Sequence, residues 1–466
     1  MSFTHDLIVV GAGPAGLAAA ATAAELGLRA LLLDEQPRAG GQIYRNVATA
    51  SPRVRALLGP DYARGSALVQ RVQGQGVEIR HDTLVWDVAP DLTVTGLQAG
   101  RSFQAGAPQL VVATGAMERA SPLPGWTLPG VLNAGAAQIA LKSGGLVPAG
   151  RVVLAGTGPL LLLVACQLLE AGVELAGLVE TAPAANRRRA LPCLPAALAA
   201  PATLAKGLQM VLRLRRAAVP WHTQAEDLRV LGDDHAMGLA FRCDGRGYAI
   251  EADTVLLHHG VVPNTQISRL LRVEHRWSDA QLAWQVVADD FGQTSLRGLR
   301  VAGDGAAIAG ARAAEAAGAL AALGAAQALG RLQAADLQRR AAPLRRALRR
   351  ERAVRPFLDA LYRPPPQVVA PADGTIVCRC EEVTAGRVRE MARLGCQGPN
   401  QTKFFSRCGM GPCQGRVCAN VVTQVLAAEL GKPPAEVGAY RIRAPIKPVP
   451  LEALARLDIT PTRTRR

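Results

Sequence analysis

The sequence is poor in aromatic residues, and it has fewer acidic than basic residues. Aromatic side chains make up 4% of the 466 residues, and 53 lysines and arginines outnumber 37 aspartates and glutamates, which gives a net charge of +16. No basic motif interleaved with aromatics and no helix-turn-helix pattern accompanies this charge, so nucleic-acid binding is not predicted. The arginines are instead spread along the chain, which indicates solvated helix faces or a surface for an acidic protein partner.

The sequence also lacks an apolar run suited to crossing a membrane. The best candidate, residues 152–169, contains Gly156, Gly158 and Pro159 where a strand would turn into a helix. It is therefore predicted to be a buried strand–helix unit, and no transmembrane segment is expected. The few residues before the first apolar strand include His5 and Asp6, so no cleavable signal is recognised and a cytoplasmic location is expected.

A closely spaced dithiol is missing from the first 377 residues. No Cys-x-x-Cys or Cys-x-x-x-x-Cys pair occurs there, which argues against dithiol–disulfide exchange. Cys166, Cys193 and Cys243 are scattered and are expected to be small buried hydrophobes. The other six of the nine cysteines follow residue 377, and in a cytoplasmic chain such a group indicates metal binding or catalysis.

What the chain does have, at its start, is a dinucleotide-binding fingerprint. An apolar strand ending at Val10 leads into Gly11-Ala-Gly13-Pro-Ala-Gly16, a helix is predicted over 14–27, and the next strand ends in Asp34-Glu35. The glycines permit a tight turn and bring a pyrophosphate to the helix N-terminus, while the acid after the second strand accepts hydrogen bonds from a ribose. Asp34 has the usual spacing, and Glu35 is the alternative. The predicted contacts are Gly11, Gly13, Pro14, Ala15, Gly16, Asp34 and Glu35.

A second, weaker fingerprint begins at residue 151. A strand leads into Gly156-Thr-Gly158-Pro-Leu-Leu161, followed by a helix and a strand that ends at Glu180. Leu161 replaces the third glycine, which normally permits close helix–strand packing, so the helix is expected to be displaced. Gly156, Gly158 and Glu180 are the candidate contacts, and three states stay open: NAD, another adenine nucleotide, or an empty site.

Closely spaced cysteines follow a proline-rich linker. Cys378-Arg-Cys380 is followed by Cys408-Gly-Met-Gly-Pro-Cys413, and thiolates spaced in this way within glycine-containing loops suit an iron–sulfur cluster. These four are the predicted ligands; Cys418 is expected five residues inside the next helix, and Cys396 stands alone. Zinc is the alternative metal, although its sites more often use two Cys-x₂₋₄-Cys knuckles.

Several motifs together resemble the flavoproteins of the disulfide-reductase and thioredoxin-reductase type, which have two dinucleotide domains. This resemblance covers residues 1 to about 330 and implies FAD in the first domain, with Asp304 at the end of the flavin site and Gly41 and Gln42 near the flavin. The motifs are Gly11–Gly16, Gly40-Gly41-Gln42, Ala113-Thr114-Gly115, Gly260-Val-Val-Pro263-Asn264 and Gly303-Asp304.

The cysteine segment resembles [2Fe–2S] domains of the bacterioferritin-associated-ferredoxin type. With residues 33–45, the whole chain is similar to the larger (A or alpha) subunits of bacterial opine oxidases and hydroxyproline dehydrogenase, and to the B subunit of hydrogen cyanide synthase. In that family a separate flavoprotein subunit oxidises the amino-acid substrate. The resemblance implies an electron-relaying subunit with such a partner, and leaves a small third subunit open.

These features predict an α/β protein with two Rossmann-like dinucleotide-binding domains and a small helical [2Fe–2S] domain. No catalytic side chain is recognised; His258 and His259 are expected to pack, and a salt-bridge role is expected for Glu118 and Arg119. A stand-alone NADH-dependent flavin oxidoreductase and a non-catalytic scaffold are the alternative functions. The expected divisions are 1–115 with 270–330 for FAD, 116–269 for the second nucleotide, 331–373 for a helical segment and linker, 374–430 for the cluster, and 431–466 for a tail.

Overall fold

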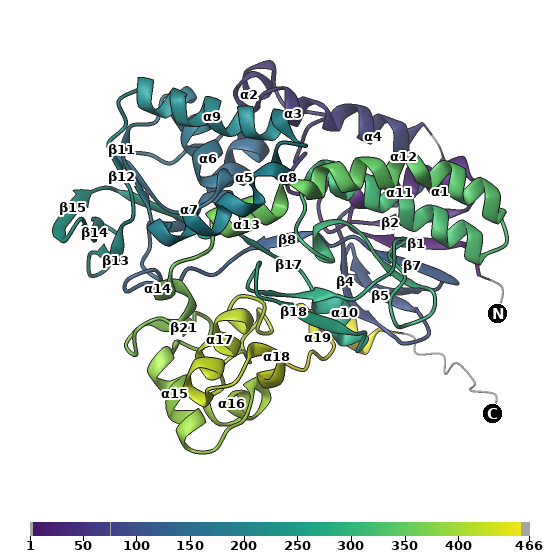
Figure 1. The fold of residues 1–466 in the computed structure, drawn as a ribbon. Helices are drawn as coiled ribbons and strands as arrows, with labels where there is room; N and C mark the ends of the chain where they lie inside the picture. The colour runs from purple at the N-terminus through teal and green to yellow at the C-terminus, as the bar shows by residue number, and fades with distance from the viewer. Residues whose placement is uncertain (1–2, 75, 458–466) are drawn as a thin grey trace.

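The chain forms two parallel five-stranded sheets, the first towards the right and the second towards the left of Figure 1. The computed structural model describes residues 3–74 and 76–457. The first sheet has the strand order β20-β7-β1-β2-β3, which is the order of a doubly wound nucleotide-binding fold. Its strands are β1 (Leu7–Val10), β2 (Ala30–Leu33), β3 (Glu78–Arg80), β7 (Gln109–Val112) and β20 (Leu299–Val301).

The first sheet is buried because helices cover it. Every residue of β1, β2 and β7 is buried, as expected for parallel strands that are covered on both faces. Helices α1 (Pro14–Glu25) and α11 (Ala311–Ala328) are rich in alanine and pack together closely. A Cβ at Gly318 would lie 1.9 Å from the Ala15 carbonyl oxygen, so only glycine permits this approach.

The second sheet has the order β12-β11-β10-β16-β9. The apolar run at 152–169 forms β10 and most of α6, as the strand–helix interpretation predicts. Within the described residues, no helix is long and apolar enough to span a membrane. The elements are β9 (Val131–Asn133), α5 (Ala134–Gly144), β10 (Val152–Gly156), α6 (Pro159–Glu170), β11 (Leu175–Glu180), α7 (Ala184–Ala190), α8 (Leu194–Ala197), α9 (Pro201–Arg216), β12 (Trp221–His222) and β16 (Thr254–His258).

Antiparallel strands extend and connect the two sheets. Strands β8 (Ala116–Glu118) and β17 (Val261–Pro263) pair where the chain passes between the two nucleotide-binding units. The other antiparallel strands are β4 (Thr83–Val88), β5 (Val94–Gln98), β6 (Arg101–Ala105), β13 (Glu226–Leu231), β14 (Gly238–Cys243), β15 (Arg246–Glu251), β18 (His275–Ser278) and β19 (Ala283–Val286). Short helices complete this part: α2 (Pro52–Leu58), α3 (Pro60–Ala63), α4 (Gly65–Gln73) and α10 (Gln266–Leu270).

Two helices lead from the first unit back to the second. Helix α12 (Ala334–Ala353) runs beside α11, and α13 (Arg355–Leu361) packs on α7 (Figure 1). The linker after α13 is fixed to the second unit, because the Gln367 amide both accepts from the Leu228 N–H (3.0 Å) and donates to the Leu228 carbonyl (2.8 Å). Gln367 belongs to the short helix α14 (Pro366–Val369).

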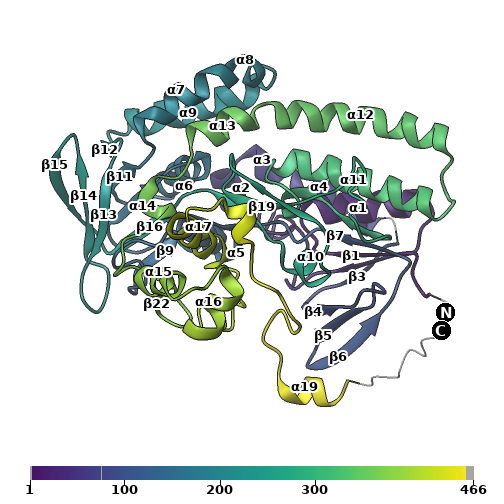
Figure 2. The same cartoon turned by 60° about the horizontal axis from the view of Figure 1, so that its bottom comes forward.

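The cysteine-containing segment forms a small helical unit, and the chain then returns to the first sheet. In Figure 2 the yellow C-terminal segment runs from this unit to α19 (Leu451–Ala455), which lies near β6. On the way, the Ile446 N–H donates to the Trp86 carbonyl in β4 (2.8 Å). The unit contains β21 (Ile376–Cys378), β22 (Val383–Thr384), α15 (Ala385–Arg393), α16 (Pro399–Ser406), α17 (Ala419–Leu430) and α18 (Pro434–Val437). Residues 458–466 of the predicted tail lie outside the described part.

Candidate functional site

A cavity of about 660 Å³ lies beside the carboxyl ends of the first sheet, within the range typical of ligand and cofactor sites. It brings together segments that are far apart in the sequence. Of the residues predicted for a flavin, it is lined by Gly11, Gly13, Pro14, Ala15, Asp34, Glu35, Gly41, Gln42, Thr114, Gly115 and Asp304. Gly16 and Gly303 lie behind this lining rather than on it.

The glycines of the first loop are required by close backbone contacts. Gly11 has a φ of +104°, and a Cβ there would lie 2.5 Å from the Ala113 carbonyl oxygen. A Cβ at Gly16 would lie 1.7 Å from the Gly11 carbonyl oxygen, so Gly16 allows α1 to pack against the turn. Gly41 approaches the same loop, since its Cβ would meet the Gly13 Cα at 2.7 Å. The resulting cradle fits a pyrophosphate at the N-terminus of α1.

The two strand-end carboxylates have different surroundings. Asp34 is buried and accepts hydrogen bonds from the backbone N–H groups of Ala12 (2.5 Å) and Gln36 (2.8 Å). Burial raises the pKa of Asp34, and these two hydrogen bonds oppose the rise. Glu35 instead forms an ion pair with Lys447 from the C-terminal segment. Lys447 also lines the cavity, and sequence reasoning missed it because nothing local connects residues 35 and 447.

Asp304 lies at the other end of the predicted flavin contacts. Its Oδ1 accepts hydrogen bonds from the backbone N–H groups of Ala309 (2.8 Å) and Gly310 (2.9 Å), at the start of α11. The carboxylate is therefore held in place by the loop that precedes the helix. Together with the glycine cradle and Asp34, it makes the donor and acceptor set suitable for an extended dinucleotide such as FAD.

The second nucleotide loop opens onto the same cavity, but its strand-end acid does not. Gly158, with Pro159 and Leu160, lines the cavity, whereas Gly156 and Glu180 do not. Burial raises the pKa of Glu180. The segment after α13 lies close by: burial, and then the charge of Glu180, raise the pKa of Tyr362 to about 12.

This segment is anchored to α7 of the second unit. The buried Asn186 side chain in α7 donates to the backbone carbonyls of Leu361 (3.3 Å) and Arg363 (3.0 Å). Several residues of this segment line the cavity, namely Arg355, Leu358, Asp359, Tyr362 and Pro364. Leu161, in place of the third glycine, is fully buried in the apolar core of this unit.

Glu118 and Arg119, for which a salt-bridge role was predicted, lie between the two nucleotide loops and have different partners. Arg119 forms no salt bridge with Glu118; its buried guanidinium donates to the backbone carbonyls of His259 (3.1 Å) and Leu282 (3.0 Å). Glu118 instead accepts from the Gly135 N–H (2.9 Å) and contacts His258 Nδ1 at 2.6 Å. The salt-bridge prediction was wrong for Arg119 because burial leaves backbone carbonyls as its nearest acceptors.

The two histidines have distinct environments. His258 is almost fully buried beside the cavity, where its ring lies 3.3 Å from the position that a Cβ on Gly158 would take. His259 packs in the interior between the hydroxyls of Ser121 (2.8 Å) and Thr181 (3.2 Å), as the packing interpretation predicts. Burial lowers the pKa of His259 to about 3, so it stays neutral.

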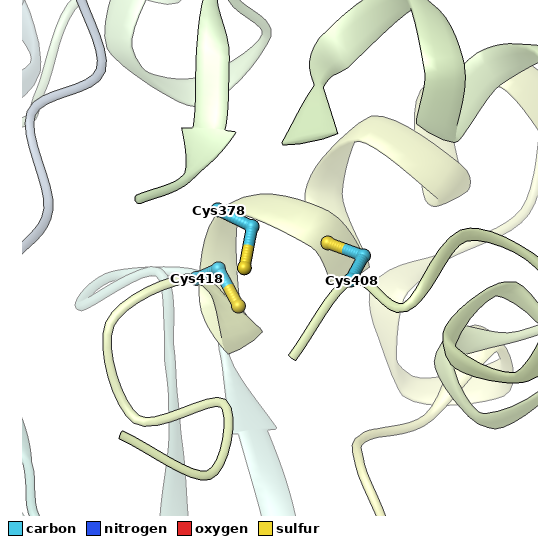
Figure 3. Close-up of side chains that lie close together, drawn as sticks. All are labelled: Cys378, Cys408 and Cys418. Carbon is cyan, nitrogen blue, oxygen red and sulfur yellow. The ribbon is translucent and has the colours of Figure 1, made fainter. Parts of the chain in front are cut away.

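Three buried cysteines form a compact group in the helical unit (Figure 3). Cys378 at the end of β21, Cys408 before the glycine loop and Cys418 before α17 have sulfur atoms within 4.8 Å of one another. The Gly409 N–H donates to the Cys378 sulfur (3.4 Å). Hydrogen bonds from Cys408 and Cys418 lower the pKa of Cys378. This donor set suits a thiolate-bound metal or iron–sulfur cluster.

The other two predicted ligands, Cys380 and Cys413, lie beside each other. Burial raises the pKa of the Cys380 thiol. A hydrogen bond with the Cys413 backbone lowers this pKa, and a hydrogen bond with the Cys413 side chain raises it. A Cβ on Gly411 would lie 2.2 Å from the Cys380 Cβ, so the glycine loop packs directly on this residue. Five cysteines are thus available where four ligands are needed.

Cys418 was expected inside a helix, but α17 begins only at Ala419. Gln414 (φ +53°) and Gly415 (φ +76°) keep the preceding stretch in turns, which leaves the Cys418 sulfur free to face the group. The Cys-x-x-x-x-Cys spacing from Cys413 to Cys418 was the signal that sequence reasoning missed. Cys396 lies outside the group of three.

Tyr440 closes the cysteine loops from one side. It is buried, and its ring lies directly over two glycines: a Cβ on Gly409 or Gly415 would approach ring atoms to 2.7 and 2.8 Å, respectively. The tyrosine therefore excludes larger residues from both loops and shields the thiols from water.

Two family descriptions match the chain. Residues 5–326 match the pyridine nucleotide-disulphide oxidoreductases, and residues 373–456 match the sarcosine oxidase A3 domain. The chain is 46% identical over 474 residues to the A subunit of opine oxidase from Agrobacterium tumefaciens (strain Ach5), which covers 99% of this chain and 93% of that protein. It is 34% identical over 471 residues to the HcnB subunit of hydrogen cyanide synthase from Pseudomonas aeruginosa, with 97% and 98% covered.

The architecture also occurs in a solved structure. L-proline dehydrogenase from P. horikoshii superposes with a TM-score of 0.70 and 18% identity, over 97% of this chain and 79% of that chain. At this identity the likeness concerns the fold alone.

Proposed function

Because this chain belongs to the pyridine nucleotide-disulphide oxidoreductase family and, over nearly its whole length, to the family of opine oxidase A subunits, we propose that it is an electron-transfer subunit. The complete enzyme would be a heteromeric dehydrogenase or oxidase that acts on an amino acid, such as an opine or hydroxyproline. The chain would carry FAD and a [2Fe–2S] cluster. It would take electrons from the flavin of a partner flavoprotein, and it would deliver them to an acceptor.

The observation that carries this proposal is the shared wall between the cavity and the cysteine unit. Arg416 lines the cavity, and its Nε donates to the Cys413 carbonyl (3.1 Å). Gln266, which also lines the cavity, donates to the Gln414 carbonyl (3.3 Å). Two sites with redox chemistry that adjoin in this way support electron transfer within one chain.

The chain's own residues divide the binding of FAD among them. The glycine loop and the N-terminus of α1 would hold the pyrophosphate, Asp34 the ribose, and Asp304 the opposite end of the cofactor. Gly41, Gln42, Thr114 and Gly115 would face the flavin part. When bound, FAD supplies the redox chemistry that no side chain of the protein provides.

The cluster would be held by four of five cysteines: Cys378, Cys380, Cys408, Cys413 and Cys418. Cys378, Cys408 and Cys418 share one buried group, and Cys380 or Cys413 would complete the set. Iron is preferred to zinc because zinc has no redox chemistry, whereas an iron–sulfur cluster can exchange electrons with a neighbouring flavin.

A stand-alone NADH-dependent flavin oxidoreductase is the second candidate function. Gly158 faces the same cavity as the predicted flavin contacts, and Glu180 ends β11 where a ribose-binding acid belongs. Two observations oppose this candidate: Leu161 replaces the third glycine of the second fingerprint, and Glu180 does not line the cavity.

Co-expression with neighbouring genes tests the proposed assembly. We expect the chain to co-purify with a second flavoprotein, with or without a small third subunit, and amino-acid oxidation to require both. A chain that purifies alone from every such co-expression, and that reduces acceptors by itself with an amino acid or an opine, would contradict the proposal. The cytoplasmic location remains a prediction.

A further inference from the structure

Arg416 occupies an unusual position between the cavity and the cysteines. It is half-buried, and it lines both the large cavity and a smaller pocket between the cysteine unit and the first two units. Only its Nε has a hydrogen-bond partner, the Cys413 carbonyl, and no carboxylate pairs with it among residues 3–74 and 76–457. Burial lowers the pKa of Arg416, but an arginine stays charged in proteins.

The surroundings of Arg416 supply little to neutralise this charge. Gln266 lines the same cavity and the same smaller pocket. Its Nε2 donates a hydrogen bond to the Gln414 carbonyl, and its buried Oε1 has no hydrogen-bond partner in the described part of the chain. The hydrogen bond to the Cys413 carbonyl holds the guanidinium beside the cysteine loop. The guanidinium is therefore a fixed positive charge that faces the cysteines on one side and the cavity on the other.

We propose that Arg416 is a positioning residue that raises the reduction potential of the cysteine-bound cluster by placing an unpaired positive charge between it and the flavin cavity. This inference rests on the proposed function. One-electron reduction of a cluster adds one negative charge and makes no new bond. A nearby cation in a partly desolvated setting favours the more negative state.

The test is a redox titration of the purified full-length protein, with dithionite as the reductant and electron paramagnetic resonance as the readout. Arg416→Gln should lower the midpoint potential so that the ratio of reduced to oxidised cluster at a fixed potential falls about tenfold, which is 59 mV for one electron. Arg416→Lys keeps the charge and should shift the ratio far less. Arg407→Gln is the matched control: it removes a charge beside Cys408, but Arg407 is exposed and already paired with Glu381.

A second variant keeps the test decisive if Arg416→Gln loses iron. Gln266→Glu places a carboxylate on the same walls without removing the bond to Cys413, and it should lower the potential in the same direction. Unchanged potentials in both variants, or an equal shift in Arg407→Gln, would overturn the inference. A wild-type protein that shows no cluster signal after reduction would instead contradict the proposed function itself.

Discussion

Cys418 is the residue whose position differs most from the expectation for its place in the chain. Its sulfur lies in the buried group with Cys378 and Cys408. We expect Cys418→Ser to lose most of its iron and acid-labile sulfide, because a hydroxyl is a poor replacement for a thiolate ligand. Cys396→Ser is the matched control, since Cys396 is also buried but lies outside the group. Full iron content in Cys418→Ser would return the ligand set to Cys378, Cys380, Cys408 and Cys413.

Asp34 and Glu35 offer a second test at the scale of single residues. Two backbone N–H groups hold the Asp34 carboxylate in place, and Asp34→Ala removes the acceptor proposed for the ribose of FAD. A hydrogen bond to a charged group is worth about 1.5–3 kcal/mol. We therefore expect the Kd for FAD to rise about tenfold or more. Glu35→Gln should change it much less, because Glu35 faces Lys447. Flavin fluorescence during equilibrium titration measures both, and the reverse order would assign the ribose to Glu35.

At the scale of elements, the C-terminal segment acts as a strap over the cavity. Ile446 and Lys447 line the cavity, and α19 continues beyond them to β6. Ending the chain at residue 443 should speed the release of FAD several-fold, and Lys447→Ala should have a smaller effect in the same direction. Arg456→Ala, at the exposed C-terminal end of α19, is the control. Equal release rates in all four proteins would show that the strap does not retain the cofactor.

Helix α5 contains a buried lysine that connects the two nucleotide-binding units. Lys142 donates to the Gln42 carbonyl (3.0 Å) and to Gln138 Oε1 (2.8 Å), and burial lowers its pKa from 10.5 to about 7. Between these two pKa values the unfolded chain binds a proton that the folded protein has released. Raising the pH through this window therefore stabilises the folded state, and the penalty is greatest below about pH 7.

Lys142→Met removes this titration. The Tm of the variant should exceed that of the wild type near pH 7, and the difference should shrink as the pH rises toward about 10. Scanning calorimetry at several pH values measures this directly. A difference that is constant with pH, or that grows, would contradict the buried-lysine account.

At the scale of the whole molecule, local patterns were predicted better than contacts between distant segments. The turn at Gly11–Gly16 and the strand–helix unit at 152–169 follow from spacing and hydrophobicity within a short window. Three long-range features do not follow from such patterns: the contact of Lys447 with Glu35, the position of Tyr362 near Glu180, and the position of Arg416 at the cavity. Each joins segments separated by more than a hundred residues, so no local periodicity records it.

The division into domains that was predicted from the sequence stays a prediction, but the contacts between units bear on how they work together. The linker is fixed to β13 through Gln367, Trp126 donates to the Ile376 carbonyl (2.7 Å), and the tail returns to the first unit. The cysteine unit is thus held against both nucleotide-binding units. Under the proposed function, such an arrangement would keep the distance between the flavin cavity and the cysteines constant.

The most direct test of the central claim is an anaerobic titration of the purified chain, in which flavin and iron–sulfur absorbance are followed together. We predict that NADH leaves both chromophores oxidised, because Leu161 replaces the third glycine of the second fingerprint and Glu180 does not line the cavity, whereas dithionite bleaches both completely. This result would mean that electrons enter from a partner subunit. Rapid bleaching of both chromophores by NADH would contradict the account and identify the chain as a stand-alone NADH-dependent flavin oxidoreductase.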